Sequence, residues 1–220
     1  SLRLKADMPN CIPFMKRELF SAEDSHLTDF CGIPSPIKAA CLHVAHDCNL
    51  RCKYCFAEDG NFGGCKELMS LETAKKAIDY LIVHSKGRKN LELDFFGGEP
   101  LMNFDVVKKT VEYARQEEKK HNKNFRFTIT TNGVLLDEEK IDFINREMSN
   151  CVLSLDGRKE VQDRMRIRPD GSGRYDKVLP NMLKLVEKRK GEQYYVRGTF
   201  TRYNLDFSED VKHLYHLGIR

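Results

Sequence analysis

The residues LELDFFGGEPL, at positions 91–101, show how this chain is organised. Hydrophobic and polar side chains alternate along the first six of them, which is the pattern of a β-strand, and two glycines end that pattern. A helical pattern follows over 104–120. This order predicts a strand, a tight turn and a helix that packs back onto the strand, which is the repeating unit of a parallel sheet.

The same order recurs about five times along the chain. We expect strands at 41–45, 91–96, 125–130, 152–155 and 195–200, and helices from 70, 104, 137, 175 and 208. Such βαβ units are right-handed and give an α/β fold with a parallel sheet, either doubly wound or a partial barrel. In these folds sites form in the loops after the carboxyl ends of the strands.

The regular pattern does not cover the whole chain. Residues 1–40 carry four prolines and little periodicity, which favours an N-terminal extension or linker. The core is predicted to span 41–220. The last residues look like the end of a helix with another strand still to come, so we expect the core to be incomplete at its C-terminus.

Composition excludes several classes of protein. Hydrophobic residues make up 40% and charged residues 32%, which is typical of a soluble globular protein. No apolar run is long enough to cross a membrane, and no signal peptide is recognisable, so a cytoplasmic protein without a membrane partner is expected. The net charge of +4 is small and the charges are interleaved, which argues against a nucleic-acid partner.

Cysteines cluster in one short segment. Cys48, Cys52 and Cys55 have the spacing C-x3-C-x2-C, and three thiolates on one loop can hold one face of an iron–sulfur cluster with one iron left open. Structural zinc is the alternative, and it needs a fourth ligand. The available candidates for that ligand are Cys41, His43, His46 and Cys65. The isolated cysteines 11, 31, 41 and 151 are expected to be buried thiols without a ligand.

At these residues the chain resembles the radical S-adenosylmethionine (SAM) enzymes. The stretch 41–56, together with GGEPL at 97–101 and SLDG at 154–157, resembles the subgroup that modifies peptides and usually carries a C-terminal SPASM extension. LHVAHDCNL at 42–50 further resembles the maturases that form thioether crosslinks in six-cysteine (SCIFF) peptides. The resemblance covers about 40–220 and implies a partial (β/α)6 TIM-like barrel with parallel strands and outer helices.

The resemblance also implies the site. A [4Fe–4S] cluster would be held by Cys48, Cys52 and Cys55, and SAM would chelate its open iron. The SAM contacts expected are, in chain order, Tyr54, Phe56, Gly97, Gly98, Glu99, Thr130, Asn132, Ser154, Asp156 and Arg166. Tight turns, core packing and ordinary surface arginine explain the same residues without a ligand. Arg164 and Arg168 are alternatives to Arg166.

The implied reaction is a reductive cleavage of SAM to a 5′-deoxyadenosyl radical, with no catalytic residue assigned beyond the cluster. The radical would modify a ribosomally made precursor peptide by forming a cysteine thioether, with ferredoxin or flavodoxin as reductant. A sulfatase-maturating enzyme that forms formylglycine is the second hypothesis, and a non-catalytic zinc or iron–sulfur module is the third. Residues 1–40 could be the remnant of a peptide-recognition module.

Overall fold

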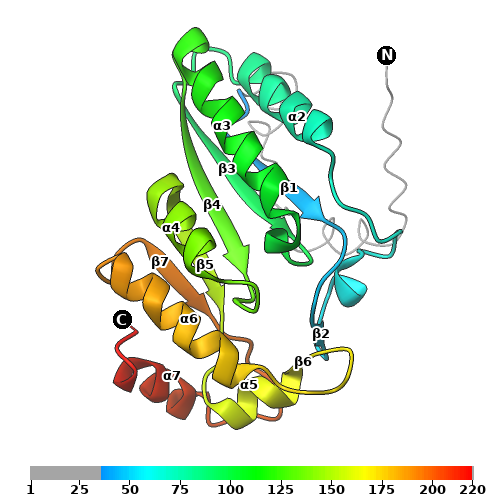
Figure 1. The fold of residues 1–220 in the computed structure, drawn as a ribbon, viewed down its shortest axis with the longest axis vertical. Coiled ribbons are helices and arrows are strands. Elements are labelled where there is room, and N and C mark those ends of the chain that lie inside the picture. Colours follow the sequence, from blue (N-terminus) through cyan, green and yellow to red (C-terminus); the bar gives the residue numbers. More distant parts are fainter. Residues whose placement is uncertain (1–35, 220) are drawn as a thin grey trace, which may run out of the picture. The chain divides into compact units, whose positions relative to one another are not determined.

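A computed structural model describes residues 36–219. Its centre is a parallel sheet in the order β1-β3-β4-β5-β7 (Figure 1). The strands are β1 (Ala39–Ala45), β3 (Asn90–Gly97), β4 (Asn124–Thr131), β5 (Met148–Ser154) and β7 (Tyr194–Arg197). All four strand pairs are parallel. The predicted α/β fold with five parallel strands is therefore confirmed, while the predictions made for 1–35 lie outside the described residues.

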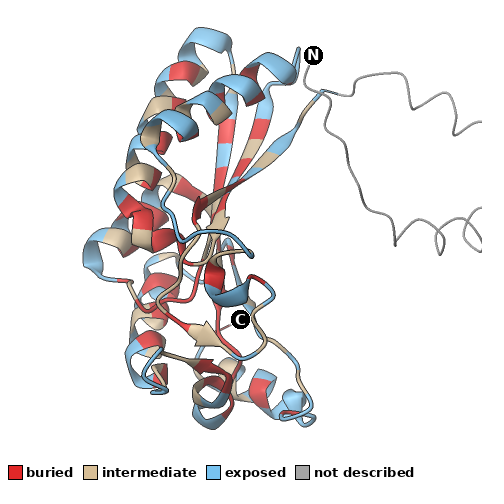
Figure 2. Ribbon diagram, turned by 90° about the vertical axis from the view of Figure 1, so that its right-hand side faces the viewer, coloured by how far each residue is buried: buried red, intermediate tan, exposed pale blue. Residues whose placement is uncertain are grey.

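Helices cover one face of this sheet. The helices that follow the strands are α2 (Leu71–His84), α3 (Phe104–His121), α4 (Glu138–Glu147), α6 (Tyr175–Lys188) and α7 (Phe207–His216). Figure 2 shows α2, α3, α4 and α6 on the same side of the strands. Between the two layers lie the largest buried side chains, among them Phe95, Phe127 and Ile129. None of the helices in the described part is long and apolar enough to cross a membrane.

Local chemistry fixes where two of these helices begin. The Ser70 hydroxyl accepts a hydrogen bond from the Thr73 N–H at 3.1 Å at the start of α2, and the Asp137 carboxylate accepts one from the Lys140 N–H at 3.0 Å at the start of α4. Such caps satisfy backbone donors that the first turn leaves free. Both caps lie at predicted helix starts, 70 and 137.

Several short elements are not apparent in the sequence. They are the antiparallel pair β2 (Arg51–Cys52) and β6 (Arg166–Ile167), helix α5 (Lys159–Met165), and the 3-10 helices η2 (Glu58–Gly60) and η3 (Pro100–Asn103). Elements of two to seven residues carry too little periodicity to be recognised. Strand β7 also ends at Arg197 and not at Phe200, because the Thr199 N–H turns away to donate to Asp156.

The second face of the sheet is different in character. Along each strand the residues that alternate with the core face away from these helices, and they include Cys41, His43 and Thr128, which are exposed or half-buried. The prediction that Cys41 is a buried thiol is wrong, because Cys41 alternates with Leu42 in β1 and is exposed. Cys151 is fully buried, as predicted. A partly polar sheet face thus leads up to the strand ends.

Candidate cluster and cofactor site

A cavity of about 210 Å³ lies at the carboxyl ends of the strands. It is lined by every predicted site residue except Asp156: Cys48, Cys52, Tyr54, Cys55, Phe56, Gly97, Gly98, Glu99, Thr130, Asn132, Ser154 and Arg166. These residues come from five separate segments of the chain. The fold therefore brings together what the sequence keeps more than a hundred positions apart.

Pairing of β2 with β6 shapes the cysteine loop. Cys52 is the register partner of Arg166, and the Lys53 N–H donates to the Met165 carbonyl at 2.9 Å. A turn then carries the chain to Cys55, whose N–H donates to the Cys52 carbonyl at 2.9 Å. The loop is thus held by a segment that lies far away in the sequence.

The thiols in this loop are partly shielded from water. Burial, reinforced by the charge of Glu99, raises the pKa of Cys48 to about 12. Burial also raises the pKa of Cys52 to about 11, although the Arg166 guanidinium opposes the shift. Bound metal supplies the positive charge that such thiolates need.

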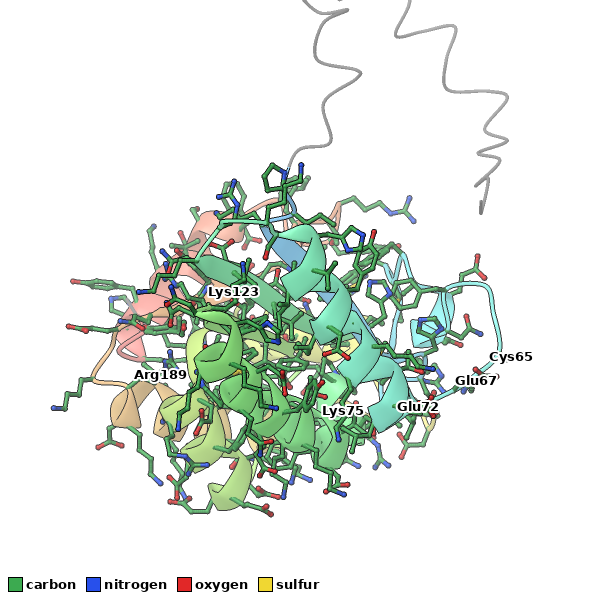
Figure 3. The ribbon with its side chains drawn as sticks, turned by 90° about the horizontal axis from the view of Figure 1, so that it is seen from above. Cys65, Glu67, Glu72, Lys75, Lys123 and Arg189 are labelled. Atoms are coloured by element: carbon green, nitrogen blue, oxygen red, sulfur yellow. The ribbon has the colours of Figure 1, made fainter. Side chains whose placement is uncertain are left out.

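The candidate zinc ligands do not complete a four-ligand site. His43 and His46 pack against the Phe62 ring, with centroids 4.5 and 5.3 Å away, and do not line the cavity. Cys65 is exposed on the outer loop, at the edge of the view in Figure 3. Within 36–219 no three His, Cys, Asp or Glu side chains are gathered tightly enough to hold one metal ion. The cavity is thus lined by three cysteines and by none of the candidate fourth ligands of a zinc site.

Gly97 and Gly98 allow two protein segments to approach closely. A Cβ on Gly97 would lie 2.3 Å from the Ala45 oxygen, and one on Gly98 would lie 2.2 Å from the Asp47 oxygen. Gly97 also has φ of +125°, which side chains rarely adopt. The sequence predicts that these glycines make room for a ligand. The nearest atoms belong instead to the start of the cysteine loop, so the glycines first serve to bring β3 against that loop.

Glu99 is buried and bonded to protein donors. Its carboxylate accepts hydrogen bonds from the Leu101 N–H at 3.0 Å, the Thr131 hydroxyl at 2.9 Å and the Asn132 N–H at 2.8 Å. Burial raises its pKa to about 7, against the effect of these donors. The resemblance predicts that Glu99 contacts SAM, with its carboxylate or nearby carbonyls accepting the ammonium hydrogens. The structure shows it joining the ends of β3 and β4, with only its remaining lone pairs free for a ligand.

Asp156 lies behind the cavity wall. Its carboxylate accepts hydrogen bonds from the Tyr54 hydroxyl at 2.5 Å, Arg166 Nη2 at 3.1 Å and the Thr199 N–H at 2.9 Å. It lines a neighbouring hollow of about 470 Å³ beside β7 and α7. Asp156 therefore positions Tyr54 and Arg166, while its own oxygens are occupied.

The structure separates the three candidate arginines. Arg166 is 5% exposed and lines the cavity. Arg164 stacks on the Tyr203 ring at 4.1 Å, and the half-buried Arg168 pairs with Asp170. Only Arg166 of the three is placed to meet a ligand in this cavity.

Sequence reasoning missed other residues here. Arg197 and Thr199 line the cavity, and Arg197 is the register partner of Ser154. Asn49 contacts Asn132 from within the cysteine loop. The strand pattern at 194–197 was a signal for Arg197, because it places alternate residues on the open face of the sheet.

Two buried polar atoms test whether the site fits a ligand. Arg166 Nε and Asn49 Nδ2 are buried without a hydrogen-bond partner among the described residues. Such groups are costly unless something binds them. A guanidinium suits a carboxylate, and the Ser154 hydroxyl in the same cavity also has no protein partner in the described part of the chain. Together with three cysteines, these donors fit an iron–sulfur cluster and a ligand that carries a carboxylate.

The model of one protein family, the radical SAM superfamily, matches residues 42–199. The chain belongs to the radical SAM superfamily. These enzymes use a [4Fe–4S] cluster and SAM and require a reductant. In this radical SAM chain Cys48, Cys52 and Cys55 would hold the cluster, and Ser154 and Arg166 would hold the SAM carboxylate.

Individual relatives differ in what they do. An uncharacterised protein, MJ0907 of Methanocaldococcus jannaschii, is 31% identical over 84% of this chain and 60% of its own length. A cysteine-type anaerobic sulfatase-maturating enzyme of Clostridium novyi is 30% identical over 68% of this chain and 40% of its own length. The radical SAM cyclopropyl synthase TigE of Paramaledivibacter caminithermalis is 26% identical over 77% of this chain and 38% of its own length. This radical SAM chain thus spans about two to three fifths of these relatives.

A solved structure agrees in fold. Native anSMEcpe with bound AdoMet has a TM-score of 0.72 at 23% identity, over 84% of this chain and 50% of that one. This agreement confirms a partial barrel of the radical SAM type.

Proposed function

We propose that this radical SAM chain modifies a ribosomally made peptide by forming a cysteine thioether crosslink. The cluster and SAM together supply a carbon-centred radical that removes a hydrogen atom from the substrate. The observation that carries the peptide proposal is the position of the cavity. Phe96, Thr130, Ser154 and Arg197 belong both to the cavity and to the sheet face that α2, α3, α4 and α6 leave uncovered. An extended chain can lie along such a face with one residue at the cavity.

Two further observations support this proposal. The resemblance of 42–50 to thioether-forming maturases includes Cys48 and extends along β1. The sulfatase-maturating relatives are, by their names, enzymes that act on another protein. A ferredoxin or flavodoxin would supply electrons.

Arg197 is the substrate contact we assign. Its guanidinium has no hydrogen bond or ion pair with the described residues, and it lies at the cavity beside Thr199. Phe56 lines the same cavity and is 72% exposed. A cation and an exposed aromatic ring that line one cavity suit a peptide carboxylate or carbonyl near the modified residue.

The first experiment asks whether SAM is cleaved. The chain is reconstituted anaerobically with iron and sulfide, reduced with dithionite and given SAM, and 5′-deoxyadenosine is measured by mass spectrometry. We expect product from the wild type and from Cys65→Ala, and none from Cys52→Ala. Zinc without iron after reconstitution would instead identify a non-catalytic metal module.

A second experiment asks what is made. Cysteine-containing peptides are incubated with the active protein, and their mass and free thiols are measured. Thioether formation would remove one hydrogen atom from carbon, which the 5′-deoxyadenosyl radical takes, and the thiol hydrogen as a proton, with one electron returning to the oxidised cluster. The peptide thus loses two hydrogen atoms and one free thiol and gains a crosslink between two residues. Formylglycine at a cysteine or serine, without a crosslink, would favour the sulfatase-maturating alternative, which several relatives support by name.

A further inference from the structure

The Asn132 side chain is fixed at both of its ends. Its Oδ1 accepts a hydrogen bond from the Val134 N–H at 3.0 Å, and its Nδ2 donates to Asn49 Oδ1 at 2.8 Å. The backbone N–H of Asn132 donates to Glu99 at 2.8 Å. Because the Val134 N–H requires an acceptor, the amide nitrogen must face the cysteine loop. Asn132 is 7% exposed, so water does not compete for these bonds.

That orientation points the amide at a cysteine sulfur. Asn132 Nδ2 lies 3.6 Å from Cys48 Sγ, within hydrogen-bond distance for sulfur. An amide nitrogen carries two hydrogens, so one can go to Asn49 and the other to the sulfur. The Leu50 N–H approaches the same sulfur at 3.4 Å. Two N–H donors therefore approach Cys48 Sγ.

Asn49 holds the Asn132 amide in this position. Its Oδ1 accepts the hydrogen bond from Asn132 Nδ2 at 2.8 Å and lies 3.9 Å from Cys48 Sγ, so the oxygen of Asn49 faces the sulfur. Its Nδ2 is turned the other way, where it is buried without a partner among the described residues. Asn49 therefore orients the donor of Asn132 and does not itself donate to Cys48.

We propose that Asn132, held by Asn49, donates a hydrogen bond to the Cys48 sulfur and thereby raises the reduction potential of a cluster bound there. Reduction adds negative charge to the cluster, and N–H donors stabilise that charge. Asn132 tunes the potential, and Asn49 is the positioning residue that orients the Asn132 amide. This assignment differs from the SAM contact that the resemblance implied for Asn132.

The test is the midpoint potential of the cluster in the absence of SAM and peptide. The chain and its variants are loaded anaerobically, checked for iron and sulfide, and titrated with the reduced cluster monitored by EPR. We expect Asn132→Ala and Asn49→Ala to shift the potential to more negative values. The double variant should shift the potential by less than the sum of the two single shifts, because the effect of Asn49 depends on Asn132. Thr128→Val, on β4 but outside the cavity, should leave the potential unchanged.

Asn132→Asp guards against simple loss of structure. It keeps the oxygen that Val134 needs but cannot donate, so its potential should also fall. Wild-type potentials in fully loaded variants would overturn the proposal. A shift that appears only after SAM is added would also overturn it and return Asn132 to the SAM site. Because no peptide is present, neither result bears on the proposed peptide modification.

Discussion

At the scale of single residues, Glu99 combines complete burial with an ionisable group. Its pKa is raised from 4.5 to about 7 by burial. Between these values the unfolded chain loses a proton that the folded chain keeps, so stability falls as pH rises and levels off above about 7. The shift corresponds to a loss on the order of 3 kcal/mol.

We therefore expect Glu99→Gln to remove this pH dependence. Urea unfolding of the cluster-free protein at pH 5 and pH 7.5 measures it, with the exposed Glu112→Gln as control. The variant also loses the acceptor for the Asn132 N–H, which costs about 1 kcal/mol at the lower pH. An equal change in the free energy of unfolding between pH 5 and pH 7.5 for wild type and Glu99→Gln would contradict the raised pKa of Glu99.

Gly98 gives a steric prediction. A methyl group there would meet the backbone oxygen of Asp47 at 2.2 Å, which a side-chain movement cannot relieve. We expect Gly98→Ala to lower the free energy of unfolding by about 1–3 kcal/mol and to reduce the iron bound after reconstitution. Gly87→Ala is the matched control, because nothing lies within 4 Å of its Cβ position. Its stability should stay within about 1 kcal/mol of the wild type.

The same scale shows what the sequence could predict of the site. The cysteine spacing and the GGE turn are local patterns, so Cys48 and Glu99 can be identified from the sequence alone. The partners of Asp156 cannot, because Tyr54 lies 102 positions from it in the chain. Asn49 belongs to no recognisable motif, and its role follows only from its hydrogen bond with the Asn132 amide.

At the scale of elements, α7 is joined to the loop before α5 by a buried carboxylate. Asp210 Oδ1 accepts hydrogen bonds from the Arg158 N–H at 3.1 Å and from Arg158 Nε at 2.8 Å. Burial raises the pKa of Asp210, but the bonds from Arg158 outweigh this and hold it below 3.8. The contribution to stability is therefore present above that pH and is lost as the solution is made more acidic.

Asp210→Asn should lower the free energy of unfolding by about 1.5–3 kcal/mol at pH 7, because it removes a charged acceptor from a buried place. Chemical unfolding followed by circular dichroism measures the loss. The exposed Glu209→Gln, which breaks only a pair with Lys212 on the same helix, should change it by less than about 1 kcal/mol. An equal loss of unfolding free energy in Asp210→Asn and Glu209→Gln would show that the Arg158–Asp210 contact does not stabilise the position of α7.

Element type was predictable where periodicity is long. Strands β3 and β4 and helix α3 follow their patterns to within two residues. Strands β2 and β6 were not predictable, since two residues have no period and their pairing joins distant segments. Strand β5 begins at Met148, four residues before the predicted start, because pairing with β4 extends it through polar Ser149 and Asn150.

At the scale of the whole molecule, the described sheet ends in an apolar edge. Strand β7 has one neighbour in this sheet, and Tyr195, Phe207 and Tyr215 nearby are each more than half exposed. Exposed edges and apolar patches favour association. We expect the 220-residue chain to self-associate as its concentration rises.

Substitutions on and away from this edge test the expectation. Tyr195→Lys should reduce the association, whereas Val83→Lys, at a similarly exposed site on α2, should not. Size-exclusion chromatography with light scattering measures the mass of each protein. Equal masses for the wild type and both variants would contradict the role of this edge.

The pairing of β2 with β6 also has a consequence in time. Cys52 is synthesised early, but its register partner Arg166 and the neighbouring Ile167 follow only after more than a hundred further residues. At about 5–20 residues per second, a ribosome needs roughly 6 to 23 s to make them. Until then the cysteine loop lacks its antiparallel partner and the guanidinium beside Cys52. A cluster held by this loop would therefore be completed late in synthesis or after release, and the early thiols would have to stay reduced until then.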